Sequence, residues 1–154
     1  MELFADASLG NIQYNLKTKS VVGSFICLSN KHLKISPLSW KSKIIDKVAE
    51  DIKSAETLAL ESSIDSAVFL SSMITELYTG QINGKHLQIK VNEDSKCLVE
   101  SLYSTKKVKK KTMRVVISSI QQYLKKGIIS DIYHMKSKDR LGDLCEGILP
   151  LPLL

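Results

Sequence analysis

Short apolar runs separated by turn-forming residues dominate the first forty positions of the chain. Three of these runs are rich in β-branched or aromatic side chains, which favour strands. They are residues 3–5, 21–28 and 33–40. The first run stops at Asp6, and the turn-forming residues Gly10 and Asn11 follow it. Pro37 requires an irregularity or an edge position in the third run. Because the runs are consecutive, we expect an antiparallel meander.

The rest of the chain alternates between helical and strand periods. Apolar residues three or four positions apart predict a long helix over 55–78, with Ser54 as its N-cap and Gly80 as its C-cap. The later elements are a strand over 87–91 that runs out near Asp94, helices over 95–104 and 113–124, a strand over 128–135 and a final helix over 139–149. Strands reached through helices are usually parallel. We therefore predict an α/β fold whose five-stranded mixed sheet, with three antiparallel and two parallel strands, is flanked by helices.

The length of 154 residues suits one compact domain. We assign residues 1–149 to it, with a basic loop at 105–112 and an apolar, proline-containing tail at 150–154. No apolar run approaches the roughly 18–20 residues that span a bilayer, and the acidic start does not resemble a signal peptide. The three cysteines form no CxxC pair, so we expect reduced thiols inside a cell and neither a zinc site nor a disulfide framework.

The formal net charge of +6 makes a polyanionic partner plausible but says nothing about the fold. The distribution of the charge is more informative, because basic residues gather in one dense block and one looser group. Our candidates for nucleic-acid binding are Lys41, Lys43, Lys106, Lys107, Lys109, Lys110, Lys111 and Arg114. The alternative for the dense block is a solvated loop between two helices.

Four carboxylates stand near the ends of predicted strands or in predicted helices. Asp6 ends the first strand, Glu56 lies in the first turn of the long helix, Asp94 ends the fourth strand and Asp143 lies in the last helix. Carboxylates that converge need cations, because like charges raise one another's pKa. Hard oxygen ligands of this kind select Mg²⁺ or Mn²⁺. Helix capping and turn formation also place acidic residues at such positions, so the pattern alone leaves their convergence open.

Five stretches resemble, in order, the motifs of the ribonuclease H domain of copia-type LTR retrotransposon polyproteins. They are residues 5–11, 37–43, 54–60, 94–98 and 137–143, which read ADASLGN, PLSWKSK, SAETLAL, DSKCL and SKDRLGD. Each match is weak alone, but five in register are specific and cover about residues 3–146. The chain departs from the family at Asn92 and Glu93, where an aromatic residue and a threonine are common.

The resemblance implies an enzyme that hydrolyses the RNA strand of RNA·DNA hybrids endonucleolytically during reverse transcription. It implies that Asp6, Glu56, Asp94 and Asp143 are both the catalytic residues and the ligands of two Mg²⁺ ions, which Mn²⁺ can replace. The implied partners are the hybrid and a reverse transcriptase domain in the parent polyprotein, with no membrane. We expect the isolated domain to be monomeric and its location to be intracellular: cytoplasm, virus-like particle or nucleus.

Two other readings remain open at this point. The chain could be a catalytically inactive, domesticated or truncated nucleic-acid-binding module, or a structural domain whose lysines pair with surface acids. Two single residues also have alternatives. A structural role for His134 is favoured over help with product release, and core packing of Trp40 over stacking on a sugar.

Overall fold

The computed structural model describes residues 1–14, 17–30, 35–45, 49, 51–80, 87–104 and 110–135. The strands are β1 (Glu2–Tyr14), β2 (Lys17–Ser29), β3 (Ile35–Ile44), β4 (Ile89–Glu93) and β5 (Ile129–His134). The helices are α1 (Ile52–Thr79), α2 (Lys96–Tyr103) and α3 (Lys111–Lys125). The helix predicted over 139–149 lies outside the described residues. None of the described helices is both long and apolar enough to cross a membrane.

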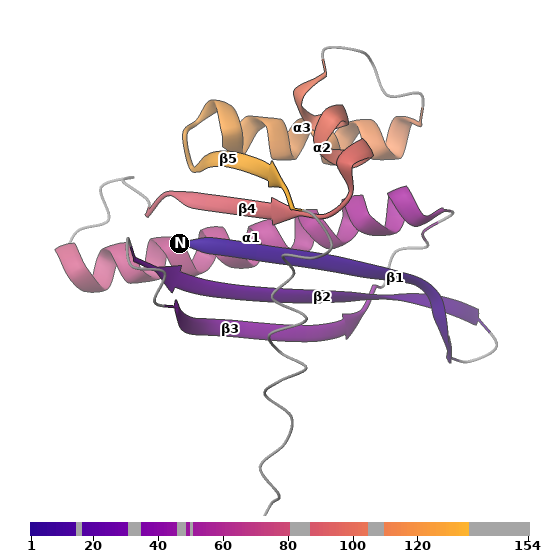
Figure 1. Cartoon of the computed structure of the whole chain (residues 1–154), viewed down its shortest axis with the longest axis horizontal. Coiled ribbons are helices and arrows are strands. Elements are labelled where there is room, and N and C mark those ends of the chain that lie inside the picture. Colours follow the sequence, from indigo (N-terminus) through magenta and orange to yellow (C-terminus); the bar gives the residue numbers. More distant parts are fainter. Residues whose placement is uncertain are drawn as a thin grey trace, which may run out of the picture.

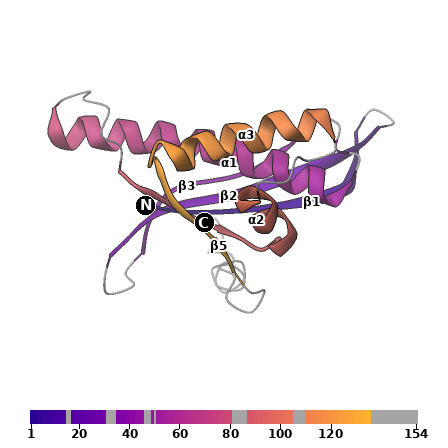
Figure 2. The same cartoon turned by 90° about the horizontal axis from the view of Figure 1, so that it is seen from above.

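The five strands form one mixed sheet in the order β3-β2-β1-β4-β5 (Figure 1). β1 pairs antiparallel with β2, which pairs antiparallel with β3. β4 pairs parallel with both β1 and β5. The predicted meander with two parallel additions is confirmed, and β1 occupies the centre of the sheet. Seen from above, α1 and α3 run side by side over the same face (Figure 2).

β1 is much longer than the sequence pattern predicted. Its pairing with β2 continues to Tyr14, so Asp6 lies within the strand and does not end it. The expected turn at Gly10 and Asn11 is therefore wrong. The register instead shifts between Ser8 and Ile12, because the residues between them oppose a single residue of β2. A bulge of this kind accommodates glycine and asparagine within a paired strand.

The core lies between the sheet and its helices. Its largest fully buried side chains come from both layers and include Leu3, Ile26, Leu60, Ile64, Ile89, Leu98, Ile120 and Ile129. Small residues on α1, among them Ala55 and Ala59, are also buried and let the helix approach the sheet closely. Apolar burial of this kind is the main stabilising term in a domain of this size.

Both ends of α1 are capped by the side-chain or backbone chemistry of nearby residues. At the N-terminus the cap is Asp51, whose Oδ1 accepts a hydrogen bond from the Ser54 amide at 2.7 Å. The predicted cap, Ser54, is instead a buried residue of the first turn, because an aspartate is available three residues earlier. At the C-terminus the predicted cap is confirmed: Gly80 has φ 65° and its amide donates to the Glu76 carbonyl.

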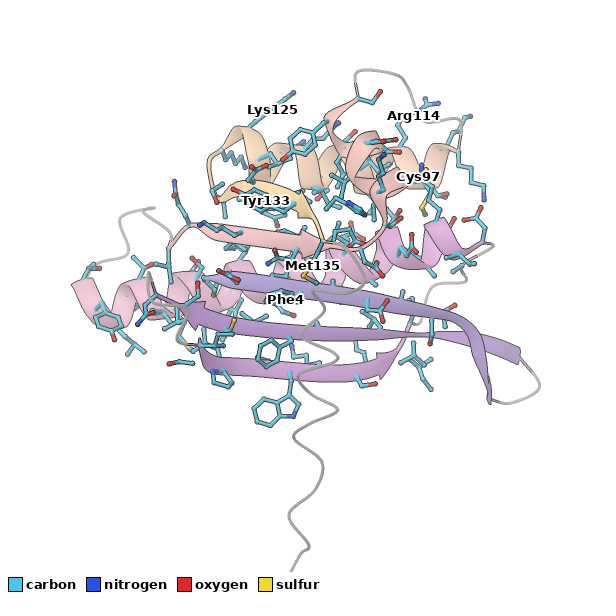
Figure 3. The ribbon with its side chains drawn as sticks, viewed as in Figure 1. Phe4, Cys97, Arg114, Lys125, Tyr133 and Met135 are labelled. Carbon is cyan, nitrogen blue, oxygen red and sulfur yellow. The ribbon has the colours of Figure 1, made fainter. Side chains whose placement is uncertain are left out.

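An aromatic row crosses the sheet face that points away from α1 and α3. Phe4, Phe25 and Trp40 are opposite one another on β1, β2 and β3, and the two phenylalanine rings lie 6.2 Å apart. Phe4 lies on this face in Figure 3. Trp40 is 75% exposed, so its predicted core packing is wrong. The cause is the alternation of β3, which turns Trp40 away from the helical layer.

The buried face of α3 should contribute far more stability than its exposed face. Replacing the fully buried Ile120 by alanine is expected to lower the free energy of unfolding by about 2–5 kcal/mol, because a cavity remains in the core. Val115→Ala on the same helix is the matched control, since Val115 is 71% exposed. Urea denaturation followed by circular dichroism measures both variants. Equal losses would contradict the packing described here.

Candidate active site

The carboxyl end of β4 carries two acidic residues in succession. Glu93 is the last residue of the strand and is only 2% exposed, whereas Asp94 follows it and is half-buried. Glu93 Oε1 accepts a hydrogen bond from the Ser95 amide at 3.1 Å. Ser95 is the N-cap of α2, so Asp94 lies in the short turn that joins β4 to this helix.

Glu93 is electrostatically coupled to two of the predicted site residues. Burial raises its pKa to about 8, and the negative charges of Asp94 and Glu56 push in the same direction, while the hydrogen bond from Ser95 opposes the shift. A hydrogen bond with the Asp94 side chain raises it further. Coulombic influence falls with distance, so the structure brings Glu56, Glu93 and Asp94 into one neighbourhood.

Glu56 reaches this neighbourhood from α1. Because the helix begins at Ile52, Glu56 belongs to its second turn and not to the first turn that the sequence pattern predicted. Its side chain is half-buried, between the fully buried Ala55 and Thr57. The helix therefore presents this carboxylate at the margin between core and solvent.

Asp6 lies on the strand next to β4. Its side chain is exposed, and its Oδ1 accepts a hydrogen bond from the Ala7 amide at 2.8 Å. The last parallel pair between β1 and β4 is Phe4 with Asn92. Asp6 and Asp94 each stand two residues beyond that pair, so continuation of the register directs both toward the same end of the sheet.

The predicted fourth carboxylate, Asp143, lies outside the described residues, and its role stays a prediction. In the part of the chain that the structure describes, no three histidine, cysteine or acidic side chains are gathered closely enough to hold a metal ion. The carboxylates nevertheless offer only hard oxygen donors, which suits Mg²⁺ or Mn²⁺ in type. Mutual repulsion tends to hold such groups apart until a cation compensates their charge.

Sequence reasoning missed Glu93, although a signal for it was present. Ile89 and Val91 alternate with polar residues, and the next position of the same phase is Glu93. All three are buried in the structure. An acidic residue in the buried phase of a strand, beside a candidate metal ligand, is the feature to look for in such a sequence.

Asp51 connects the start of α1 to the start of α3. Its Oδ2 lies 2.6 Å from Nζ of Lys110, the N-cap residue of α3. The hydrogen bonds from Lys110 and Ser54 lower the pKa of Asp51 to about 2. The ion pair is formed by half-exposed side chains and fixes one end of the predicted basic loop.

The basic candidates divide into three groups. Lys106, Lys107 and Lys109 lie outside the described residues. Lys110 is paired with Asp51, which is the kind of contact that a solvated structural loop would make. Lys111 and Arg114 are exposed on the first turns of α3, and Arg114 extends away from the sheet (Figure 3).

The basic residues of β3 face α1 from the far edge of the sheet. Lys41 donates a hydrogen bond to Ser66 Oγ at 3.2 Å. Lys43 lines an open pocket of about 220 Å³ together with Glu61 and Asp65 of α1. These two lysines are therefore separated from α3 and would contact a different part of a long ligand.

His134 ends β5 and is opposite Glu93 in the parallel register. Its side chain is exposed, which places an imidazole at the same end of the sheet as the carboxylates. The two described cysteines, Cys27 and Cys97, form no disulfide.

No family model and no curated protein sequence matches the chain. Solved structures do. A ribonuclease H1 isolated from compost by a metagenomic approach has a TM-score of 0.61 and 15% identity, over 89% of this chain and 84% of that chain. The fold is ribonuclease H-like. The ribonuclease H1 of the halophilic archaeon Halobacterium salinarum NRC-1 is similar over 89% of this chain and 86% of its own, with a TM-score of 0.55 and 14% identity.

The same fold occurs within a longer viral chain. The protease-reverse transcriptase of prototype foamy virus has a TM-score of 0.59 and 16% identity, over 96% of this chain and 19% of that one. At identities this low the likeness establishes the ribonuclease H-like fold and leaves the activity to be argued from the residues.

Ionisation of Glu93 should make the folded domain less stable as the pH rises. Its pKa is raised from 4.5 to about 8 in the folded state, so folding is favoured at low pH, and this advantage is lost progressively as the pH rises from about 4.5 to about 8. Glu93→Gln cannot ionise. Relative to the original chain, we expect its free energy of unfolding to gain on the order of a few kcal/mol between pH 5 and pH 9. Urea denaturation in metal-free buffer at a series of pH values measures the free energy of unfolding of both proteins. If this free energy changed with pH in the same way in both, a buried Glu93 with a raised pKa would be contradicted.

The N-cap of α1 should matter more than the ion pair on its other oxygen. Asp51→Ala is expected to cost about 0.5–2 kcal/mol of stability, because the Ser54 amide loses its partner. Asp51→Asn keeps an oxygen acceptor and loses only the charge, and a surface ion pair contributes at most about 1 kcal/mol. Thermal unfolding compares the two variants. If asparagine were as destabilising as alanine, the pairing with Lys110 would be the dominant contact.

Proposed function

We propose that this chain is a ribonuclease H that hydrolyses the RNA strand of RNA·DNA hybrids endonucleolytically. The observation that carries the proposal is the neighbourhood of Glu56, Asp94 and the buried Glu93, with Asp6 on the adjoining strand, in a ribonuclease H-like fold. Ends of neighbouring parallel strands are where folds of this kind commonly place chemistry.

Two divalent cations, Mg²⁺ or Mn²⁺, would be held by Asp6, Glu56, Asp94 and Asp143. Such ions, when bound, activate water and stabilise the departing oxygen in phosphodiester hydrolysis. The chain itself contributes ligands from separate elements, and their spacing is set by the sheet and by α1. The half-buried position of Glu56 and Asp94 limits their motion, while the exposed Asp6 remains open to a large substrate.

Basic side chains would hold the hybrid through its phosphates. The described candidates are the exposed Lys111 and Arg114 on α3 and the exposed Lys43 on β3. Phosphate contacts of this type provide affinity without sequence preference. The compost ribonuclease H1 has been solved in complex with an RNA/DNA hybrid, which supports the choice of ligand.

We further propose that the domain derives from a retroelement polyprotein of copia type and acts beside a reverse transcriptase. The sequence motifs support the copia-type origin. The foamy virus chain, a protease-reverse transcriptase of which this fold is a part, supports the association with a polymerase. Action of this kind would take place inside the cell or in a virus-like particle.

The proposed activity is tested by incubating the full chain with a labelled RNA·DNA hybrid in Mg²⁺ and in Mn²⁺. We expect cleavage of the RNA strand alone, and a loss of about a hundredfold or more in Asp6→Asn and Asp94→Asn, because each removes one charged oxygen ligand. Asp143→Asn examines the fourth ligand in the same way. Glu76→Gln, on the exposed far end of α1, is the control for loss of an acidic charge.

Each outcome has a separate meaning. Cleavage that persists in Asp6→Asn would contradict the site assignment. Binding of the hybrid without cleavage by the folded chain would contradict the enzymatic proposal and favour the inactive nucleic-acid-binding module. Cleavage of both strands, or of duplex DNA, would contradict the substrate class.

A further inference from the structure

The strongest unassigned feature of the molecule is the buried carboxyl of Glu93. It is 2% exposed, whereas most of the buried side chains in the described part of the chain are apolar. Burying such a group costs free energy unless its oxygens find partners, so the fold must gain something from its contacts. Glu93 was not among the residues predicted to form the active site.

The side chain of Glu93 makes a hydrogen bond at the N-terminus of α2, where the N-cap residue itself makes none. Ser95 is the N-cap residue, but its own side chain makes no capping hydrogen bond. In a capping box, a glutamate or glutamine three residues after the N-cap accepts the N-cap amide. Here that position holds the fully buried Leu98, which has no acceptor. Glu93 Oε1 accepts the Ser95 amide at 3.1 Å instead, from the strand that precedes the helix.

The backbone of Glu93 also holds the end of β4 in place. The Glu93 carbonyl accepts a hydrogen bond from the Met135 amide at 2.9 Å, which connects it to the end of β5. The hydrogen bond from the Ser95 amide to the Glu93 side chain closes the turn over residues 93–95 across Asp94, much as an aspartate side chain closes a turn to the amide two residues on.

We infer that Glu93 is a positioning residue: by accepting the Ser95 amide from a buried site, it fixes the turn that presents Asp94 to a divalent cation. The inference rests on the proposed function, since it assigns Asp94 a metal-binding role. Glu93 acts through Asp94 and need not touch the metal or the substrate. Its contribution is the preorganisation of one ligand, which ligand sets require for tight binding.

The test compares Glu93→Gln with Glu93→Met. Glutamine keeps an oxygen acceptor of the same reach, whereas methionine has a similar shape and no comparable acceptor. Binding of Mn²⁺ to each full chain is measured by isothermal titration calorimetry, with Asp94→Asn for comparison. We expect the affinity of Glu93→Gln to stay within about twofold of the original chain, and that of Glu93→Met to fall about tenfold or more, the range known for supporting shells of metal ligands.

A second measurement does not depend on the stability of the methionine variant. Amide hydrogen exchange at Ser95, followed by NMR, should remain slow in Glu93→Gln, because the acceptor is retained. If Glu93→Met does not fold, slow exchange and unchanged Mn²⁺ affinity in Glu93→Gln still support the inference, and fast exchange there overturns it.

The remaining outcomes separate this inference from the proposed function. Equal losses of Mn²⁺ affinity in both variants would overturn the positioning role and make Glu93 a charged ligand. Unchanged affinity in a folded Glu93→Met would overturn the role outright, even with Asp94→Asn impaired. An original chain that binds no Mn²⁺ and cleaves no hybrid would overturn the proposed function, and with it the role of Glu93 toward a metal.

Discussion

The packing of α1 across the central strands of the sheet is the contact on which the other features depend. Fully buried Leu60 and Ile64 of the helix lie in the same core as Leu3 and Ile26 of β1 and β2. This contact fixes the helix against β1 and so determines where Glu56 lies relative to Asp6 and Asp94. Dense packing of this kind transmits position well, because a core side chain has few alternative arrangements.

Burial of the Glu93 carboxyl at the end of β4 lowers the stability that this packing provides. Glu93 is buried close to two other carboxylates, and its pKa is raised to about 8 as a result. An arrangement that served stability alone would place an apolar residue there, as it does at Ile89 and Val91. An acid at this position costs stability, and the cost is partly offset because the Glu93 side chain accepts the Ser95 amide.

Polar contacts at the ends of the helices join α1 to α3 and α2 to the sheet. Asp51 joins the start of α1 to Lys110 at the start of α3, and the Tyr103 hydroxyl at the end of α2 hydrogen-bonds Asp131 of β5. These contacts are partly exposed and contribute modestly to stability. Their effect is geometric, since they fix the flanks of the basic region relative to the carboxylates.

The amino-acid sequence by itself determined the element order and the fold class. Hydrophobic periodicity can be read within one segment of the chain, without knowing which segments contact it in the fold. The family-like motifs of the sequence made Asp6, Glu56 and Asp94 candidate site residues, a role that stays a prediction. The glycine after the apolar pattern of α1 predicted the C-cap at Gly80, which the structure confirms. The sequence failed on the length of β1, on the Asp51 cap and on the exposure of Trp40, which depend on pairing and layer arrangement. Glu93 emerged only from the tertiary structure. Its role follows from burial beside Asp94 and Glu56, and long-range packing decides which charges become neighbours.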